Sequence, residues 1–199
     1  MTVGDKAMTA PHDMAVTLGI LAGGRATRLG GRDKAWLERD GVPQVLRIAR
    51  RFPEAVQVLV SANTDPVDFA RHGLQAVPDN HAGLGPMGGL EALARTCETE
   101  WLLTLPVDLV GFNECLLPTL RAGTGADGAW AEDEDGPQPL VALWRVTALR
   151  EGTSSVLAAD DVSVRGLQAR LAMARVQFAG VRFGNLNTFD DLRAAGFHA

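Results

Sequence analysis

Two cationic side chains that could neutralise a phosphate, Arg28 and Lys34, lie in one glycine-rich segment. Residues 21–34 read Leu-Ala-Gly-Gly-Arg-Ala-Thr-Arg-Leu-Gly-Gly-Arg-Asp-Lys, with four glycines and four cations. Because Gly23 and Gly24 lack a Cβ, their backbone N–H groups can approach an anion closely. Arg28 and Lys34 can offset the charge that grows as a phosphorus–oxygen bond breaks. The segment therefore predicts phosphate chemistry, although it matches neither the P-loop pattern nor the GxGxxG pattern.

Aspartates that follow apolar runs form a second set of candidates. Asp108 follows the run at residues 101–105. If a triphosphate binds within reach, the Asp108 carboxylate could bind Mg²⁺ together with phosphate oxygens and water. Asp79 follows the run at residues 74–77 and precedes a glycine-rich loop, residues 81–89, whose helix N-terminus suits a phosphate or ribose hydroxyls. The alternative for each aspartate is a cap of a turn or helix. The alternative for the loop is a tight connection that needs glycine for packing.

Two asparagines near the end of the chain, Asn185 and Asn187, form a third set. In an extended segment, residues two apart point to the same side, so these amides could bind a polar heterocycle or a phosphate together. An asparagine that precedes a helix is also a good N-cap, so capping stays open as the alternative.

Other polar groups carry no predicted chemistry. Residues 132–137 read Glu-Asp-Glu-Asp-Gly-Pro, a composition typical of a solvated turn. The pair Ser154-Ser155 lacks a strained Gly-x-Ser-x-Gly turn, so hydrolase chemistry has no support. Cys97 and Cys115 are too few for a disulfide framework and favour a reducing cytosol. The four tryptophans are predicted to pack in the core rather than to stack on bases.

Composition and charge exclude several classes of protein. Of 199 residues, 46% are hydrophobic and 22% are charged, which is enough apolar surface for a core, so disorder is excluded as the main state. The longest apolar stretch, residues 15–24, falls well short of the roughly 20 residues that a bilayer crossing needs. The formal net charge of −5 disfavours nucleic-acid binding. These features favour a cytoplasmic globular protein with neither a membrane nor a nucleic acid as partner.

Short apolar runs alternate with amphipathic segments, and together they position the candidate residues. This pattern is typical of βαβ units around a mainly parallel sheet, so the predicted fold class is α/β. Residues 1–14 are predicted to form a flexible tail and residues 15–199 a single domain. The predicted strands are residues 15–21, 56–62, 74–77, 101–105, 126–131, 139–146 and 176–183, and the predicted helices are residues 42–52, 65–72, 88–99, 113–122, 147–159, 164–174 and 188–195.

A set of motifs, in order along nearly all of residues 15–196, resembles the molybdenum cofactor guanylyltransferases. The chain departs from the family pattern at Val107 and Leu29, where cysteine and methionine are usual. The motifs are Leu21-Ala-Gly-Gly-x-x-x-Arg28-Leu-Gly-Gly-x-Asp33-Lys34, the stretch from Asp79 to Gly89 with Gly85-Pro86, Pro106-x-Asp108, Gln138-Pro139-Leu140 and Asn185-x-Asn187-Thr188.

The resemblance implies a Rossmann-like, three-layer α/β/α nucleotidyltransferase domain with a mostly parallel sheet. It implies transfer of GMP from GTP to the terminal phosphate of Mo-molybdopterin, with molybdopterin guanine dinucleotide and pyrophosphate as products. It also implies Mg²⁺ as the cofactor and molybdoenzyme maturation proteins as candidate partners.

The resemblance assigns expected roles to residues at matching positions. Lys34, Arg28 and Asp108 are the expected catalytic residues, and Asp108 is the expected magnesium ligand. The other expected nucleotide-binding residues are Leu21, Ala22, Gly23, Gly24, Ser61 and Asp79, and those expected on the pterin side or in turnover are Gly85, Gly89, Asn185 and Asn187.

The choice of base rests on the first motif. Relatives that transfer CMP usually read Leu-Ala-Ala-Gly, whereas residues 21–24 read Leu-Ala-Gly-Gly and Asp33 precedes Lys34, which favours GTP. The alternatives are a cytidylyltransferase or sugar-phosphate nucleotidyltransferase that uses the same loops, and a nucleotide-binding module without turnover. The presence of both Lys34 and Asp108 favours an enzyme.

Overall fold

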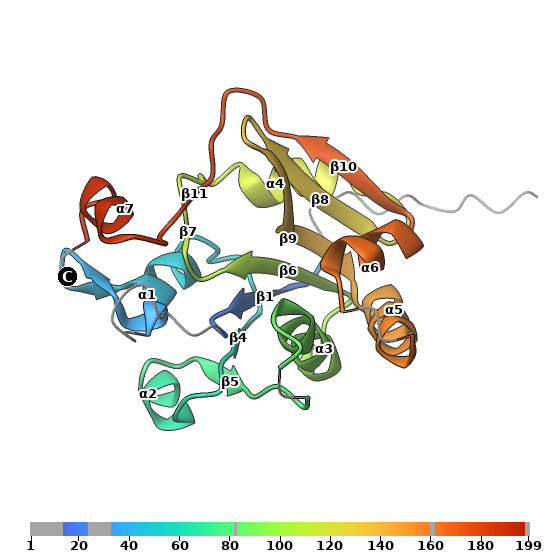
Figure 1. Cartoon of the computed structure of the whole chain (residues 1–199), viewed down its shortest axis with the longest axis horizontal. Coiled ribbons are helices and arrows are strands. Elements are labelled where there is room, and N and C mark those ends of the chain that lie inside the picture. The colour runs from blue at the N-terminus through green and yellow to red at the C-terminus, as the bar shows by residue number, and fades with distance from the viewer. Residues whose placement is uncertain (1–13, 24–32, 82, 160–161, 198–199) are drawn as a thin grey trace, which may run out of the picture.

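A seven-stranded sheet runs through the centre of the computed structural model (Figure 1). The structure describes residues 14–23, 33–81, 83–159 and 162–197, so residues 1–13 of the predicted tail lie outside the described part. In spatial order, the strands are β10 (Met173–Gln177), β8 (Gly128–Asp133), β9 (Gly136–Arg145), β6 (Trp101–Pro106), β1 (Val16–Leu21), β4 (Gln57–Ser61) and β5 (Gln75–Val77).

Strand β1 lies between β6 and β4, and the three strands are parallel. Leu21 at the end of β1 is opposite Ser61 in β4 and opposite Pro106 in β6. Strand β5 adds to β4 in parallel, and β10 adds to β8 in parallel, whereas β9 is antiparallel to both of its neighbours. Because parallel strands end at one edge, the segments after β1, β4, β5 and β6 meet where ligands bind in open α/β sheets.

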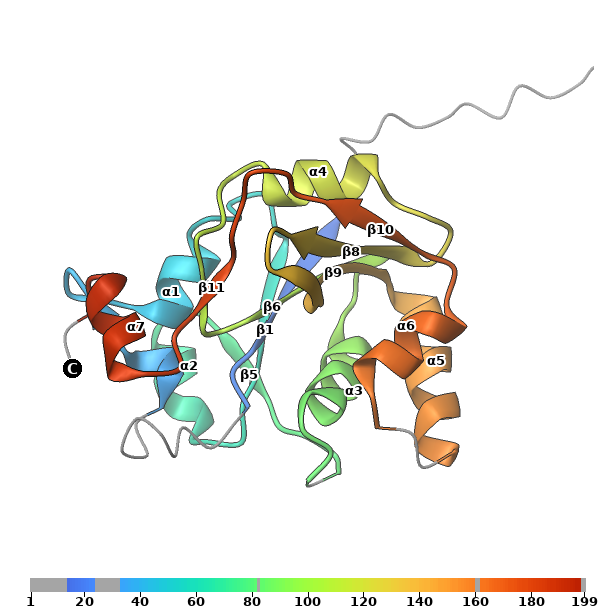
Figure 2. The same cartoon turned by 45° about the horizontal axis from the view of Figure 1, so that its top comes forward.

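Helices cover both faces of the sheet. One face buries side chains from α1 (Gln44–Ala49), α2 (Pro66–Arg71) and α4 (Leu116–Ala122), and the other buries side chains from α3 (Pro86–Thr96), α5 (Val146–Ala158) and α6 (Val164–Arg170). Figure 2 shows α3, α5 and α6 grouped together, away from α4. Alternation along β1 explains the split, since Leu18 and Ile20 face the first core and Leu21 faces the second. The predicted three-layer α/β/α fold with a mostly parallel sheet is confirmed.

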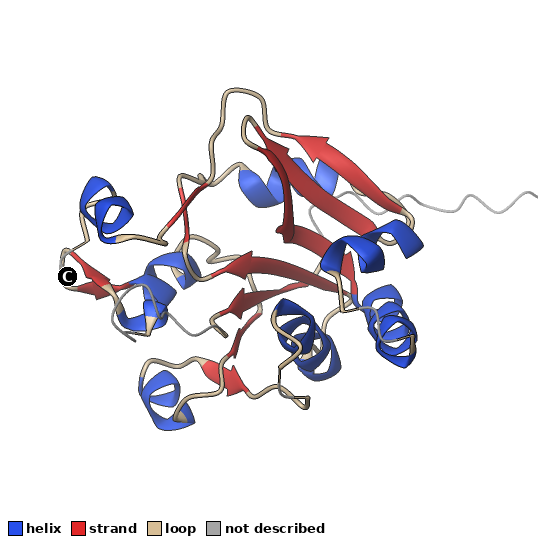
Figure 3. Cartoon of the chain, in the orientation of Figure 1, coloured by secondary structure: helices blue, strands red, loops and turns tan. Residues whose placement is uncertain are grey.

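Short elements carry further candidate residues beside the sheet (Figure 3). They are the 3-10 helix η3 (Lys34–Trp36), the hairpin of β2 (Glu38–Arg39) and β3 (Val42–Pro43), the ribbon of β7 (Leu109–Val110) and β11 (Gly184–Asn185), and α7 (Phe189–Ala194). A small core of Leu37, Leu186, Leu192 and Phe197 packs α7 against the segment that follows η3. This core fixes the C-terminal segment close to η3, which begins with Lys34.

The structure corrects the predicted boundaries near the C-terminus. The helix predicted at residues 164–174 ends at Arg170, and the strand predicted at residues 176–183 is β10, which begins at Met173 and ends at Gln177. Strand β10 pairs in parallel with β8, and at residues 173 and 174 this pairing outweighs the predicted helical periodicity. The remaining predicted helices and strands are present with shifted ends.

The prediction of a solvated turn at residues 132–137 is wrong for Asp133. This residue is only 3% exposed. Its carboxylate accepts hydrogen bonds from the backbone N–H groups of Phe183 and Asp135, at 2.6 and 3.0 Å, and from Nε2 of Gln138 at 3.2 Å. Burial by itself raises the pKa of Asp133, but the hydrogen bonds to the ionised carboxylate outweigh burial and hold the pKa below its usual 3.8. Asp133 therefore anchors the segment after β10 to the β8–β9 turn.

Tryptophan side chains contribute to the cores, as predicted. Trp101 and Trp144 are 3% and 0% exposed, and both lie in strands. Trp36 packs against Phe69, with the two ring centroids 4.9 Å apart. Across the described residues, no helix combines the length and the apolar character needed to cross a membrane.

Candidate active site

The amine of Lys34 meets two side chains that are distant in sequence. Lys34 begins η3, whose start is capped by Asp33 through a 2.9 Å hydrogen bond from the N–H of Ala35. The Nζ atom of Lys34 lies 2.7 Å from Oδ2 of Asp108 and 2.9 Å from Oδ1 of Asn187. Lys34, Asp108 and Asn187, which come from three separate segments, thus form one hydrogen-bonded group that we call the lysine cluster.

Hydrogen bonds fix the backbone around Asp108. The N–H of Val107 donates to the carbonyl of Leu21 at 3.0 Å, and the carbonyl of Asp108 accepts from the N–H of Leu186 at 2.9 Å. The side chains of Lys34 and Asp108 are 20% and 22% exposed. The pair is therefore held in place and still open to a ligand.

Asn187 is held by Asp191, which is not among the predicted site residues. Oδ2 of Asp191 accepts from the backbone N–H groups of Asn187 and Thr188, at 3.0 and 2.8 Å, and Oγ1 of Thr188 accepts from the N–H of Asp191 at 3.1 Å. These bonds form a capping box at the start of α7, and the Thr188-x-x-Asp191 spacing is its signal in the sequence. Hydrogen bonds from Thr188 and Asn187, with a smaller effect of the Lys34 charge, hold the pKa of Asp191 below its usual 3.8.

A second cluster surrounds the carboxylate of Asp79, which follows β5. Its Oδ1 accepts from Oγ of Ser61 at 3.3 Å, and its Oδ2 accepts from Nδ2 of Asn63 at 3.0 Å. The N–H of Asp79 in turn donates to Oδ1 of Asn63 at 2.9 Å. We call Ser61, Asn63 and Asp79 the aspartate cluster. Asn63 is not among the predicted site residues, although it follows the same strand end as Ser61 and could have been found from that position.

Backbone at the end of β1 runs between the two clusters. The N–H of Ala22 donates to the carbonyl of Ser61 at 2.9 Å, and a Cβ on Gly23 would lie 3.9 Å from Oγ of Ser61. Since neighbouring strands lie about 4.8 Å apart, the ends of β4 and β6 are separated by about 10 Å across Leu21. One nucleotide can bridge that span.

Packing and backbone geometry account for Gly89 and Gly85. A Cβ on Gly89, in α3, would lie 2.6 Å from Oγ of Ser61 and 2.8 Å from Cδ2 of Leu21. Helix α3 can therefore approach the ends of β1 and β4 only without a side chain at this position. Gly85 precedes α3 with φ 56° and ψ −139°, a conformation that residues with a Cβ avoid. These observations agree with the packing alternative for the second glycine-rich loop.

Asn185 does not join Asn187 in the lysine cluster. Asn185 pairs with Leu109 in the β7–β11 ribbon, and the N–H of Asn187 folds back to the carbonyl of Asn185 at 3.1 Å. Because of this turn, the segment is not extended between the two asparagines, so the condition for both amides to point the same way is not met. Gly24 and Arg28 lie outside the described residues.

The lysine cluster offers oxygen donors suited to a hard cation. Among the residues that the structure describes, no group of three or more His, Cys, Asp or Glu could hold a metal ion by itself. Mg²⁺ usually takes only one or two carboxylates from a protein and completes its shell with phosphate oxygens and water. The carboxylate of Asp108 and the side-chain oxygen of Asn187 therefore fit Mg²⁺ that arrives with a triphosphate.

Comparisons with known proteins agree with this geometry. Residues 18–174 match the MobA-like NTP transferase domain. The chain is 40% identical to a molybdenum cofactor guanylyltransferase of Cereibacter sphaeroides over 182 residues, which cover 88% of this chain and 93% of that protein. It is 33% identical to a molybdenum cofactor guanylyltransferase of Shewanella putrefaciens over 183 residues, which cover 86% of this chain and 91% of the relative.

A solved structure shares the fold. The crystal structure of molybdopterin-guanine dinucleotide biosynthesis protein A from Archaeoglobus fulgidus superimposes with a TM-score of 0.69 at 18% identity, over 90% of this chain and 96% of that one. The domain match covers most of the chain, and the curated relatives match it over nearly their full length. The chain therefore belongs to the MobA-like NTP transferase family, together with the molybdenum cofactor guanylyltransferases.

Proposed function

We propose that this chain transfers GMP from GTP to the terminal phosphate of Mo-molybdopterin and releases pyrophosphate. One observation carries the proposal: the amine of Lys34 lies 2.7 Å from Asp108 and 2.9 Å from Asn187, beside the ends of β1 and β6. A lysine and a carboxylate in this arrangement suit the binding of a triphosphate with its cation. The names of the curated relatives support guanylyl transfer as the reaction.

Lys34 is the residue that contacts phosphate in this proposal. An ammonium group has three N–H donors, and two of them point at Asp108 and Asn187. The third donor is available for a phosphate oxygen without loss of the cluster. The positive charge offsets the charge that builds on the α-phosphate and the departing pyrophosphate, an effect worth about 10²–10³ in rate.

The aspartate cluster is the proposed nucleoside site. Each carboxylate oxygen of Asp79 has two lone pairs, and hydrogen bonds from Ser61 and Asn63 use one on each oxygen. The remaining lone pairs can accept from N–H or O–H groups of guanosine. Because the backbone of Leu21 and Ala22 runs between the clusters, one GTP can contact both.

Asp108 is the proposed ligand of Mg²⁺, with Asn187 as a neighbouring oxygen donor. When bound, Mg²⁺ neutralises negative charge on the phosphates of GTP. The chain holds the donors in position, since the backbone of Asp108 is tied to Leu186 at 2.9 Å and the backbone of Asn187 is tied to Asp191 at 3.0 Å.

The proposed reaction needs no general base. A phosphate monoester has a second pKa of about 6 and is mostly ionised near neutral pH. A pterin phosphate oxygen attacks the α-phosphorus of GTP, the bond from that phosphorus to the β-phosphate oxygen breaks, and pyrophosphate leaves with the electron pair. The protein contributes positioning and electrostatic stabilisation, which the lysine cluster can supply without a nucleophile of its own.

The setting of the reaction follows from the same proposal. We place it in the cytoplasm, with molybdoenzyme maturation proteins as recipients of the product. The net charge of −5 argues against a nucleic acid as an additional partner.

A nucleotide panel with the purified full-length chain tests the proposal. The chain is incubated with Mo-molybdopterin, Mg²⁺ and GTP, CTP, ATP or UTP in turn, and both pyrophosphate and the pterin product are measured. GTP should give pyrophosphate and the guanine dinucleotide, and omission of either the pterin or Mg²⁺ should abolish both. Faster turnover with CTP would overturn the choice of GTP. Nucleotide binding without pyrophosphate release from any triphosphate would favour a module without turnover.

A further inference from the structure

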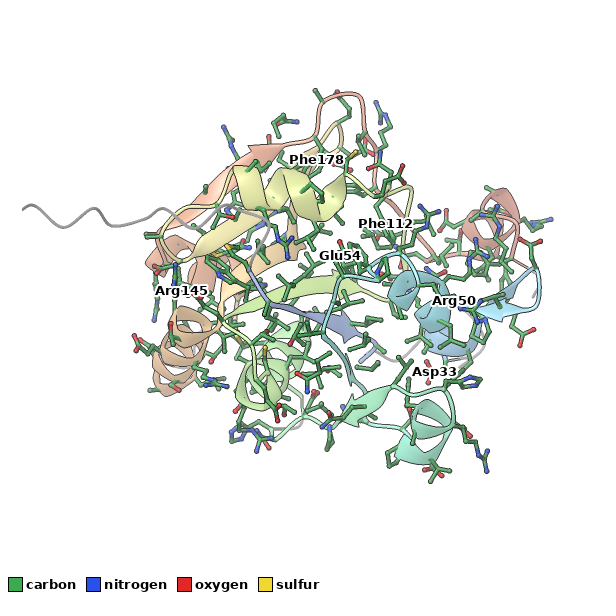
Figure 4. All side chains as sticks on the ribbon, turned by 180° about the vertical axis from the view of Figure 1, so that it is seen from behind. Asp33, Arg50, Glu54, Phe112, Arg145 and Phe178 are labelled. Carbon is green, nitrogen blue, oxygen red and sulfur yellow. The ribbon has the colours of Figure 1, made fainter. Side chains whose placement is uncertain are left out.

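A pocket of about 280 Å³ lies between α1 and residues 109–112. Lys34, Asp108 and Asn187 are not part of its lining, so it is separate from the lysine cluster. Figure 4 shows this side of the molecule, with Arg50 at the end of α1 and Phe112 after β7. Small-molecule sites usually measure about 300–1,000 Å³, so this pocket suits a compact ligand.

Four arginines give the pocket its charge: Arg39, Arg47, Arg50 and Arg51. Within the described part of the chain, none of the other lining residues is acidic. Asp40 is the carboxylate closest to the group, 3.4 Å from Nε of Arg39 and 3.9 Å from Nη1 of Arg47, and its own side chain is 75% exposed. Arg50 and Arg51 form no ion pair with a described carboxylate. The pocket is therefore strongly positive in a chain whose net charge is −5.

Most of the N–H donors of these arginines are available. Each guanidinium has five N–H donors in a planar fork. Arg47 donates to the carbonyl of Arg39 and Arg51 donates to the carbonyl of Phe112, both at the long distance of 3.4 Å. A planar fork of this kind suits a phosphate, which can accept two hydrogen bonds from one arginine. The pocket thus has both the charge and the donors for a polyvalent oxyanion.

An apolar wall completes the pocket. Val42, Val110 and Phe112, which are all partly exposed, form part of its lining. Phe112 is fixed by stacking on Phe52, with ring centroids 5.9 Å apart and an angle of 14° between the rings. Inorganic phosphate alone would leave this wall exposed to water, whereas an anion with an apolar body would cover it.

We propose that this pocket binds a phosphorylated small molecule with a compact hydrophobic or aromatic body. A phosphomonoester carries a charge of about −1.5 to −2 near neutral pH and has three acceptor oxygens, enough for the forks of two arginines. Its body covers the wall around Val110 and Phe112. The proposal is independent of guanylyl transfer, because it concerns residues outside both clusters.

Phenyl phosphate is the probe, titrated into the ¹⁵N-labelled full-length chain and followed by NMR. The backbone signals of Gly111 and Phe112 should shift in a saturable way. Phenyl phosphate should bind at least about tenfold tighter than inorganic phosphate, because the ring is buried. The double variant Arg50→Gln and Arg51→Gln should weaken binding of phenyl phosphate by at least about tenfold.

Two controls locate the effect. The double variant Arg71→Gln and Arg165→Gln removes the same charge from α2 and α6 and should leave binding of phenyl phosphate unchanged. Lys34→Ala should also leave it unchanged, because Lys34 does not line the pocket. Arg50 and Arg51 are exposed, so their double variant should keep a folded spectrum.

Four results would overturn the proposal. Equal binding by the Arg50 and Arg51 double variant would remove the arginine site. Shifts confined to Leu21 and Ala22 and lost in Lys34→Ala would assign the anion to the nucleotide site. Inorganic phosphate that binds as tightly as phenyl phosphate would remove the role of the wall. An acidic peptide that saturates the pocket where phenyl phosphate does not would make it a protein contact instead.

Discussion

Replacement of Asp108 by asparagine tests whether the charge of this side chain serves catalysis rather than folding. The variant keeps the size of the side chain and one carbonyl oxygen, so Lys34 retains an acceptor there as well as Asn187 at 2.9 Å. Hydrogen bonds to charged groups contribute about 1.5–3 kcal/mol when buried. Because the side chains of Lys34 and Asp108 are 20% and 22% exposed, water screens the pair and we expect a loss of about 1 kcal/mol. For a chain of this length, that loss lowers Tm by about 2–4 °C.

The expected loss of turnover is much larger than the loss of stability. Removal of a group that stabilises transition-state charge costs about 10²–10³ in rate, which is about 3–4 kcal/mol of barrier. The assay is pyrophosphate release from GTP and Mo-molybdopterin over a range of Mg²⁺ concentrations, with the melting temperature measured on the same samples. Asp68→Asn, on α2, removes an exposed carboxylate that pairs with Arg71 at 3.0 Å and should leave turnover unchanged. Turnover at the wild-type rate in a folded Asp108→Asn variant would refute the proposed role.

Three further changes test other parts of the account. Gly89→Ala places a Cβ 2.6 Å from Oγ of Ser61. Overpacking costs about 1–3 kcal/mol and the higher helix propensity of alanine offsets about 1 kcal/mol, so the urea midpoint should fall slightly. Calorimetry should show weaker GTP binding, because Ser61 belongs to the proposed nucleoside site. An unchanged GTP affinity would contradict the proposed nucleoside site. Asp191→Ala frees the backbone of Asn187 and should lower kcat several-fold, which is less than the loss in Asp108→Asn. Asp191→Glu should restore kcat, because glutamate also completes a capping box. Equal kcat in wild type and Asp191→Ala would exclude positioning of Asn187 through Asp191. Asp133 has a folded-state pKa below 3.8, so its carboxylate stabilises the fold above that pH and loses this effect as the pH falls through the folded-state value. Asp133→Asn should therefore lower the free energy of unfolding, measured by urea denaturation near neutral pH, by about 1–3 kcal/mol. This difference from wild type should shrink below pH 3.8, and a difference that stays constant with pH would contradict the stabilising role of the Asp133 carboxylate.

Much of the fold could be predicted because the central strands are apolar runs with clear ends. The strand at residues 15–21 and the strand at residues 101–105 match β1 and β6 within one residue at each end. The C-terminal part could not be predicted as well. Residues 173 and 174 belong to the segment with helical periodicity, and the parallel pairing with β8 that places them in a strand is a long-range contact that local patterns do not report.

The candidate site shows the same division between local and long-range information. Lys34 and Asp108 could be chosen from their positions after strands, but their 2.7 Å contact depends on how separate segments pack. Asp133 escaped prediction because the composition of residues 132–137 is that of a surface turn, and its buried hydrogen bond from Phe183 joins residues 50 positions apart. Asn63 could have been chosen from its position after β4, but its contact with Asp79 depends on the pairing of β4 and β5.

The most direct test of guanylyl transfer follows the phosphorus atoms of GTP. The full-length chain is incubated with Mo-molybdopterin, Mg²⁺ and GTP labelled with ³²P at either the α- or the γ-phosphate, and the pterin product and pyrophosphate are separated and counted. If the pterin phosphate attacks the α-phosphorus at the lysine cluster, the α label appears only in the pterin dinucleotide and the γ label only in pyrophosphate. A γ label in the pterin product, or an α label that stays in GTP or appears as free GMP, would contradict the account.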